Sequence, residues 1–90
     1  MYEVRRQVAS LEEGVLRVLY EGPASACECA AGVVLYAYAA EVVTDELERL
    51  LAGLTAHGFV REVAESAPRR YAITAAGSER LASLVEAANR

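Results

Sequence analysis

Hydrophobic residues recur at helical spacing in several parts of this chain. Ahead of the first set, Ser10 and Glu13 have the spacing of an N-terminal capping box, in which each side chain satisfies a free backbone N–H. The stripe that follows has the i, i+4, i+7, i+8 spacing of a buried helix face, and its members are Leu11, Val15, Val18 and Leu19. Gly22-Pro23 predicts the end of this first helix.

A second capping box, Ser25 with Glu28, predicts the start of a second helix. We expect this helix to run from Ala26 to about Ala40. Its far half contains the run VVLYAY at 33–38, which has an equally good propensity for a strand. A helix is favoured because alanines and cysteines precede that run.

The third helix is predicted to start with Thr44 as its N-cap, because Asp45 and Glu46 follow where the helix dipole favours negative charge. Its apolar stripe, which predicts core packing, is Leu47, Leu50, Leu51 and Leu54. Gly58 occupies the position after a helix where a positive φ is required. We therefore expect a helix over about 44–57.

Two short segments after that helix, 59–63 and 70–73, alternate in part between apolar and polar residues. The segment between them contains Pro68, which cannot donate to a β-ladder, so a hairpin is predicted. Thr74 then caps a last helix, whose stripe is Leu81, Leu84, Val85 and Ala88. The prediction is one domain over residues 1–90, mainly α with a small β-hairpin (α+β), in the order helix-helix-helix-hairpin-helix.

The charge pattern is unusual for a nucleic-acid-binding protein. The net charge is −4 and all nine positive side chains are arginines. Three arginines and two glutamates give the segment 59–74 a local charge of +1, and local charge decides binding more than the average does. No uncharged apolar stretch reaches the roughly 18 residues of a membrane span, and the first residues lack a secretory signal. We expect a cytoplasmic protein.

The residue types that usually carry chemistry are sparse. Cys27 and Cys29 form a CxC, which suits neither a relaxed disulfide nor a zinc site, so two reduced cysteines packed in a helix are expected. The single histidine, His57, falls in the last turn of the third helix, where a capping role is more common than catalysis. No phosphate-binding loop, metal-ligand cluster or catalytic constellation is present in the sequence. We expect no enzyme activity, no cofactor and no metal.

The segment 69–81, RRYAITAAGSERL, has the form R-x-Y-x-[I/L]-T-x-x-G followed by Leu. Together with the order of elements, it resembles the winged helix-turn-helix domains of PadR-like and MarR-like transcriptional regulators. The resemblance extends over residues 11 to about 85 and includes further matching positions, which are Leu19, Glu21, Gly22, Pro23, Leu50, Leu51, Leu54, Gly58, Phe59 and Val60. The chain departs from the families at Asp45, Glu46 and Glu48, where they usually carry polar or basic residues.

The resemblance implies a small DNA-binding regulator, with the helix at about 44–57 in the major groove and the wing at about 59–73 on the backbone or minor groove. The residues assigned to the major groove are Arg49, Thr44 and Glu48; a carboxylate such as Glu48 can accept from cytosine N4. Arg69 and Arg70 are assigned to the wing contact, although a solvated hairpin tip paired with Glu62 and Glu65 explains them equally well. Further candidate contacts are Arg61 in the wing and, as an auxiliary arm, Arg5 and Arg6.

The alternative interpretation is a winged-helix module that binds protein and not DNA. The three acidic residues near the start of the third helix would repel phosphates. The apolar content of 54% is high for a chain of 90 residues, although much of it is alanine, and an exposed apolar patch would mark an interface. On either interpretation we expect a homodimer that forms through the terminal helices or the Ala-rich segment 26–40.

Overall fold

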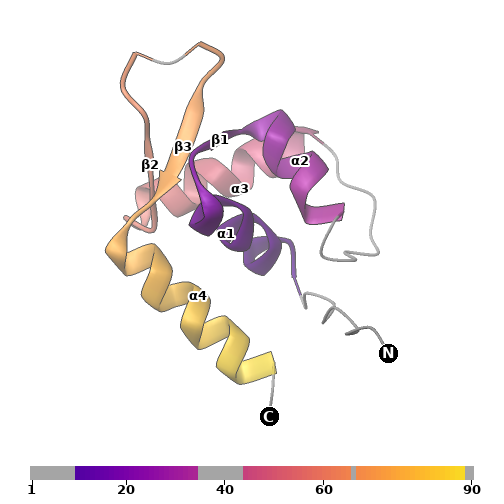
Figure 1. Ribbon diagram of the computed structural model, residues 1–90, viewed down its shortest axis with the longest axis vertical. Coiled ribbons are helices and arrows are strands. Elements are labelled where there is room, and N and C mark those ends of the chain that lie inside the picture. Colours follow the sequence, from indigo (N-terminus) through magenta and orange to yellow (C-terminus); the bar gives the residue numbers. More distant parts are fainter. Residues whose placement is uncertain (1–9, 35–43, 66, 89–90) are drawn as a thin grey trace.

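The computed structural model describes residues 10–34, 44–65 and 67–88. Within them lie four helices and three antiparallel strands (Figure 1). The elements in chain order are α1 (Leu11–Glu21), β1 (Ala24–Ser25), α2 (Ala26–Val34), α3 (Thr44–Ala56), β2 (Val60–Glu62), β3 (Arg70–Ile73) and α4 (Ala75–Ala88). This α+β arrangement confirms the predicted fold class. Arg5, Arg6 and the predicted helical segment 35–40 lie outside the described residues.

The two predicted capping boxes lie where α1 and α2 begin. At α1 the Glu13 N–H donates to Ser10 Oγ at 3.2 Å. At α2 both bonds of the box are present, because the Ser25 N–H donates to Glu28 Oε1 at 3.0 Å and the Glu28 N–H donates to Ser25 Oγ at 3.3 Å. These bonds satisfy backbone donors that a helix start otherwise leaves free.

For α3, the prediction for the N-terminus is wrong and the prediction for the C-terminus is correct. Thr44 is the first residue inside the helix, so its assignment as the N-cap is wrong by one position. The sequence cannot separate the two positions, because a threonine followed by two acids suits either. The C-terminal prediction is confirmed: Gly58 has φ +79°, and the N–H groups of Gly58 and Phe59 donate to the carbonyls of Thr55 and Leu54. This pair of bonds is a Schellman motif.

The strands form one sheet in the order β1-β3-β2, with both neighbouring pairs antiparallel. The β2–β3 hairpin is the predicted wing. The two-residue strand β1 was not predicted, because Ala24-Ser25 has no strand signal of its own and is ordered by pairing with Tyr71 and Arg70. Thr74 caps α4 as predicted: its Oγ1 accepts from the Gly77 N–H at 3.0 Å and donates to the Gly58 carbonyl at 2.6 Å.

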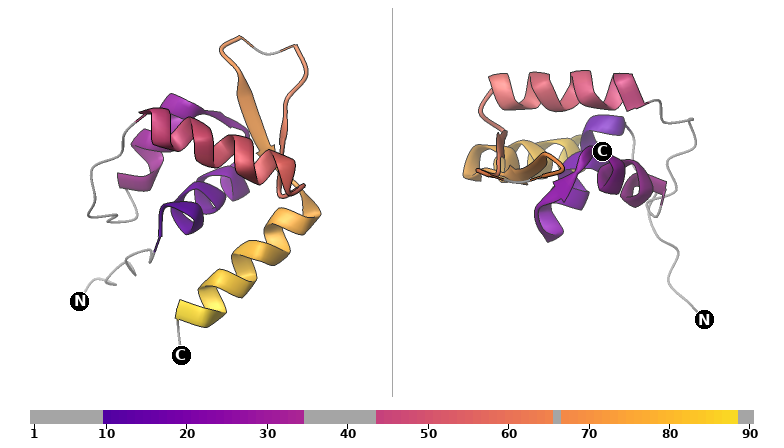
Figure 2. Two further views of the ribbon diagram at one scale, coloured as in Figure 1. Left: turned by 180° about the vertical axis from the view of Figure 1, so that it is seen from behind. Right: turned by 90° about the horizontal axis from the view of Figure 1, so that it is seen from above.

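The core lies where α1 packs against α2, α4 and β3, and where α3 covers α2 and β2. Its largest fully buried side chains are Leu16, Leu19, Leu47, Leu51, Glu13, Val15, Val33, Val60 and Cys29. The stripe predicted for α4 is only partly correct: Leu81 is buried, Leu84 and Val85 are half-buried, and Ala88 is exposed. The outer half of α4 extends away from the body (Figures 1 and 2), and Leu84 and Val85 pack only against the edge of the core.

The wing and α4 lie toward opposite ends of the molecule (Figure 1). Helix α3 runs along one side of the body, and the hairpin rises from near its C-terminal end (Figure 2). Among the described residues, no helix has the length and apolar character needed to cross a bilayer.

Candidate nucleic-acid interface

Helix α3 has one buried and one exposed face. Leu47, Leu51 and Leu54 point into the core, because their spacing places them on one side of the helix. The exposed residues that flank this stripe are Thr44, Asp45, Glu46, Glu48, Arg49, Ala52, Thr55 and Ala56. The N-terminal half of this exposed face carries three carboxylates and one guanidinium.

A first groove, which we call the wing groove, separates α3 from the hairpin and the start of α2. It has a volume of about 710 Å³. Its lining residues are Ser25, Ala26, Cys27, Glu48, Ala52, Thr55, Glu62, Pro68, Arg69 and Tyr71. Cys27 and Thr55 had no predicted role here, and nothing local in the sequence indicates that α2 and the hairpin converge on α3.

Arg69 is held within the wing groove. Its Nε lies 3.1 Å from Glu62 Oε1, and the two side chains are 69% and 51% exposed. A side-chain hydrogen bond with Tyr71, followed by the charges of Glu62 and Glu48, raises the pKa of the Arg69 guanidinium. The ion pair with Glu62 agrees with the interpretation of a paired hairpin tip. Because exposed ion pairs are weak, it leaves Arg69 available at small cost.

Arg70 is the first residue of β3 and, unlike Arg69, does not line the wing groove. Its Nη2 donates to the Pro23 carbonyl oxygen at 2.8 Å, at the turn between α1 and β1. Its charge also contributes, after the stronger effect of the Ser25 hydrogen bonds, to lowering the pKa of Glu28. Arg69 and Arg70, both assigned to the wing contact, therefore have different surroundings: the first lines the wing groove and the second bonds to the turn before β1.

Among the predicted arginine contacts within the described ranges 10–34, 44–65 and 67–88, the side chains of Arg49 and Arg61 make no ion pair or hydrogen bond. Arg61 is exposed on β2. Arg49 leans to the side of α3 opposite the wing groove, into a second groove of about 470 Å³ that we call the α3–α4 groove. That groove is lined by Glu12, Arg49, Leu50, Gly53, Leu54, His57, Phe59 and Arg80. Glu48 and Arg49 therefore line different grooves.

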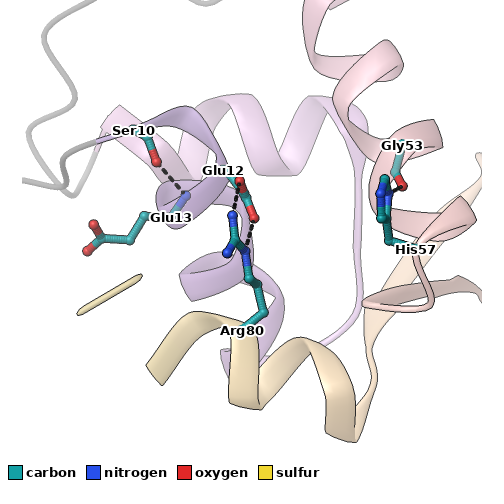
Figure 3. A network of polar contacts seen from close by, with 6 residues as sticks. All are labelled: Ser10, Glu12, Glu13, Gly53, His57 and Arg80. Atoms are coloured by element: carbon teal, nitrogen blue, oxygen red, sulfur yellow. Dashed lines mark hydrogen bonds and ion pairs between the residues drawn. The ribbon is translucent and has the colours of Figure 1, made fainter. Parts of the chain in front are cut away.

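The α3–α4 groove is built by contacts that the sequence analysis missed. Arg80 of α4 makes a two-point ion pair with Glu12 of α1, with Nε–Oε2 at 2.7 Å and Nη2–Oε1 at 3.2 Å (Figure 3). The pKa of Arg80 is raised by this bond and by the charge of Glu12. The two residues are 68 positions apart, so no local pattern could have paired them.

His57 also lines this groove. Its Nδ1 donates to the Gly53 carbonyl oxygen at 2.8 Å, because a carbonyl oxygen can only accept (Figure 3). Its ring stacks on Phe59 with centroids 5.8 Å apart. This geometry fits the helix-end role that was expected of the residue.

A third groove lies between α1 and α4 and has a volume of about 880 Å³. The residues that line this α1–α4 groove are Arg17, Tyr20, Glu21, Ser78, Leu81, Ala82, Val85 and Glu86. Tyr20 is 66% exposed, the only large hydrophobic side chain this exposed in the described part of the chain. Such a surface is typical of an interface with another molecule.

The two cysteines are free, and they differ in exposure: Cys27 is exposed and Cys29 is buried. Burial, with a smaller effect of the Glu28 charge, raises the pKa of the Cys29 thiol to about 11. Within the described ranges, no three side chains of His, Cys, Asp or Glu are grouped so that they could hold a metal ion.

Comparison with known proteins supports the architecture. No family model and no curated protein matches this chain. Two solved structures match it. One is a complex of hsRosR-S4, which is 23% identical with a TM-score of 0.72, and the match covers 91% of this chain and 71% of that one. The other is H. salinarum RosR grown from NaBr, with the same identity and TM-score, and the match covers 92% of this chain and 76% of that one. RosR is a haloarchaeal winged-helix transcription regulator.

At this identity the likeness shows the fold alone. The chain has the winged helix-turn-helix fold. Assignment to the PadR-like or MarR-like families stays a prediction.

Proposed function

We propose that this protein is a DNA-binding transcriptional regulator, of the PadR-like or MarR-like kind, that acts in the cytoplasm as one winged-helix domain over residues 1–90. In this proposal the helix at about 44–57 enters the major groove and the wing at about 59–73 contacts the backbone or minor groove. The observation that carries it is the exposed face of α3 beside a projecting hairpin, because this pair of elements is what a winged helix presents to a duplex. The similarity to RosR, a transcription regulator, supports the proposal.

The roles proposed for individual residues depend on which side chains are exposed and can contact DNA. Arg61 is assigned to a backbone phosphate, because it is exposed and free of partners in the described ranges. Arg69 and Arg70 are assigned to further wing contacts with the duplex, Arg69 after release from Glu62 and Arg70 after release from the Pro23 carbonyl. Thr44, Glu48 and Arg49 remain the candidates for the major groove, and Arg5 with Arg6, outside the described residues, remain candidates for an auxiliary arm.

The test is binding of a fluorescently labelled mixed-sequence duplex, followed by anisotropy across a salt series. Phosphate contacts release counterions, so removing one should flatten the log–log salt slope by about 0.9. We expect that flattening for Arg61→Gln. Arg61→Lys keeps the charge and serves as the matched control, with a slope close to that of the wild type. Absence of wild-type binding even at about 50 mM salt would refute the proposal, because phosphate contacts are strongest there.

A second candidate function is protein binding without DNA, or homodimerisation, and the α1–α4 groove favours it. Tyr20 projects beside the half-buried Val85 of α4, and this exposed apolar area needs a partner surface to bury it. We expect the wild type to sediment as a homodimer and Tyr20→Arg to sediment as a monomer with an unchanged circular dichroism spectrum. A wild type that stays monomeric at high concentration would contradict this surface assignment. The Ala-rich segment 26–40 was the other proposed surface, and beyond Val34 it lies outside the described residues.

A further inference from the structure

The charges beside α3 are divided unequally between its two sides. The wing groove holds two carboxylates, Glu48 and Glu62, and one guanidinium, Arg69. The α3–α4 groove holds two guanidiniums, Arg49 and Arg80, and one carboxylate, Glu12. In a chain of net charge −4, the α3–α4 groove is therefore a locally positive site, and local charge determines where a phosphate is attracted.

Both arginines that line the α3–α4 groove have N–H donors left for a ligand. Arg80 is fixed by its two-point bond to Glu12, which uses two of its five N–H donors, Nε–H and one on Nη2. The remaining three have no bond within the described residues. Arg49 has no partner in the same ranges and approaches from α3. Two guanidiniums from two different helices, one preoriented by a carboxylate, can hold a phosphate between them.

We propose that the α3–α4 groove binds a phosphate of the DNA backbone, with Arg49 and Arg80 as the contacting residues and Glu12 as the residue that positions Arg80. This inference rests on the proposed DNA-binding function and deepens it. It adds a phosphate contact on the side of α3 opposite the wing. The protein would then contact the DNA backbone on both sides of this helix. It also reassigns Arg49 from reading bases to holding the backbone, and it places the carboxylate of Glu48 on the other side of the helix from this phosphate.

Two substitutions and one matched control test the proposal in the same anisotropy experiment, using one mixed-sequence duplex and several defined ones. Arg49→Gln should weaken binding to all duplexes by a similar factor and flatten the salt slope by about 0.9. Glu12→Gln removes the charge that neutralises Arg80, while the amide oxygen of Gln can still accept one of the two Arg80 bonds and keep the guanidinium oriented. It should tighten binding several-fold at low salt and steepen the slope by up to about 0.9.

Glu79→Gln is the matched control for Glu12→Gln, because it makes the same change in net charge without touching the groove. Glu79 is exposed on α4 next to Arg80 and lines none of the three grooves. We expect its affinity and salt slope to stay close to those of the wild type. Circular dichroism and urea unfolding confirm that each variant is folded, and Arg49→Gln keeps the proposal testable if loss of the Glu12–Arg80 pair unfolds the protein.

The outcomes separate this inference from the function on which it rests. If the wild type binds DNA and Arg61→Gln weakens it, but Arg49→Gln and Glu12→Gln behave like the wild type, the groove assignment is wrong and the DNA-binding function stands. A loss with Arg49→Gln that is confined to certain duplexes means a base contact, and it overturns the assignment to phosphate. A wild type that binds no DNA overturns both. Inorganic phosphate then shows, by NMR of the arginine Nε–H signals, whether the groove holds free anions instead.

Discussion

Replacing Gly77 with alanine should destabilise the protein through a clash with the backbone. A Cβ at this position would overlap the carbonyl oxygen of Phe59 and lie 2.7 Å from Ile73 Cγ1. The Phe59 carbonyl cannot easily move aside, because it accepts from the Thr74 N–H at 3.1 Å. The hydroxyl of Thr74 also bonds to the Gly58 carbonyl at 2.6 Å, so the start of α4 is fastened to the turn after α3 at two points.

The expected size follows from two opposing effects. Alanine gains about 1 kcal/mol of helix propensity over glycine, and overpacking a closely fitted site costs about 3 kcal/mol. The net loss is therefore about 2 kcal/mol. For a domain of this size, that loss lowers Tm by roughly 10 °C.

Urea unfolding followed by circular dichroism measures the effect. The matched control is Gly53→Ala, also within a helix, where an added Cβ would meet nothing within 4 Å. This control should be more stable than the wild type by about 1 kcal/mol, because only the propensity effect remains. If Gly77→Ala is as stable as the wild type or as Gly53→Ala, then α4 does not pack as closely against the turn between α3 and β2 as the structure shows.

Three further predictions concern α2 and the residue that caps it. Ser25→Ala should cost about 1 kcal/mol of unfolding free energy, since it removes the cap of a helix start. The Ser25 bonds lower the pKa of Glu28, so its contribution is present at neutral pH and is lost as the pH falls below its usual value of 4.5 and through the lowered one. Glu28→Gln should remove that part of the acid dependence of stability, and an unchanged pH profile would contradict the assignment. For the cysteines, iodoacetamide near neutral pH should modify exposed Cys27 and spare buried Cys29, whose pKa of about 11 keeps it a thiol. Mass spectrometry should find one adduct on the native protein and two in urea; two on the native protein would refute the burial of Cys29.

Several features of the fold could be predicted from the sequence because their physical causes are local. A capping box needs residues three apart, a buried helix stripe needs residues three or four apart, and Gly58 needs only its own freedom to adopt a positive φ. The sequence therefore predicted several features correctly. These are the hairpin, the end of α3 and the starts of three helices, at Ser10, Ser25 and Thr74. The role of Thr44 was predicted wrongly by one position, because local signals do not distinguish the N-cap from the first residue of a helix.

Only the tertiary structure decided how the functional groups are distributed. Arg69 lines the wing groove and Arg70 bonds to the Pro23 carbonyl, although the two arginines are neighbours in the chain. Packing of α1 against α4 brings Glu12 to Arg80, although 68 positions separate them. Charge and hydrogen bonding act through distances in space, which the sequence leaves undetermined until the helices have packed. The sequence by itself thus determined which elements form, and the packing of those elements determined which arginines are paired, which are free, and on which side of α3 each one lies.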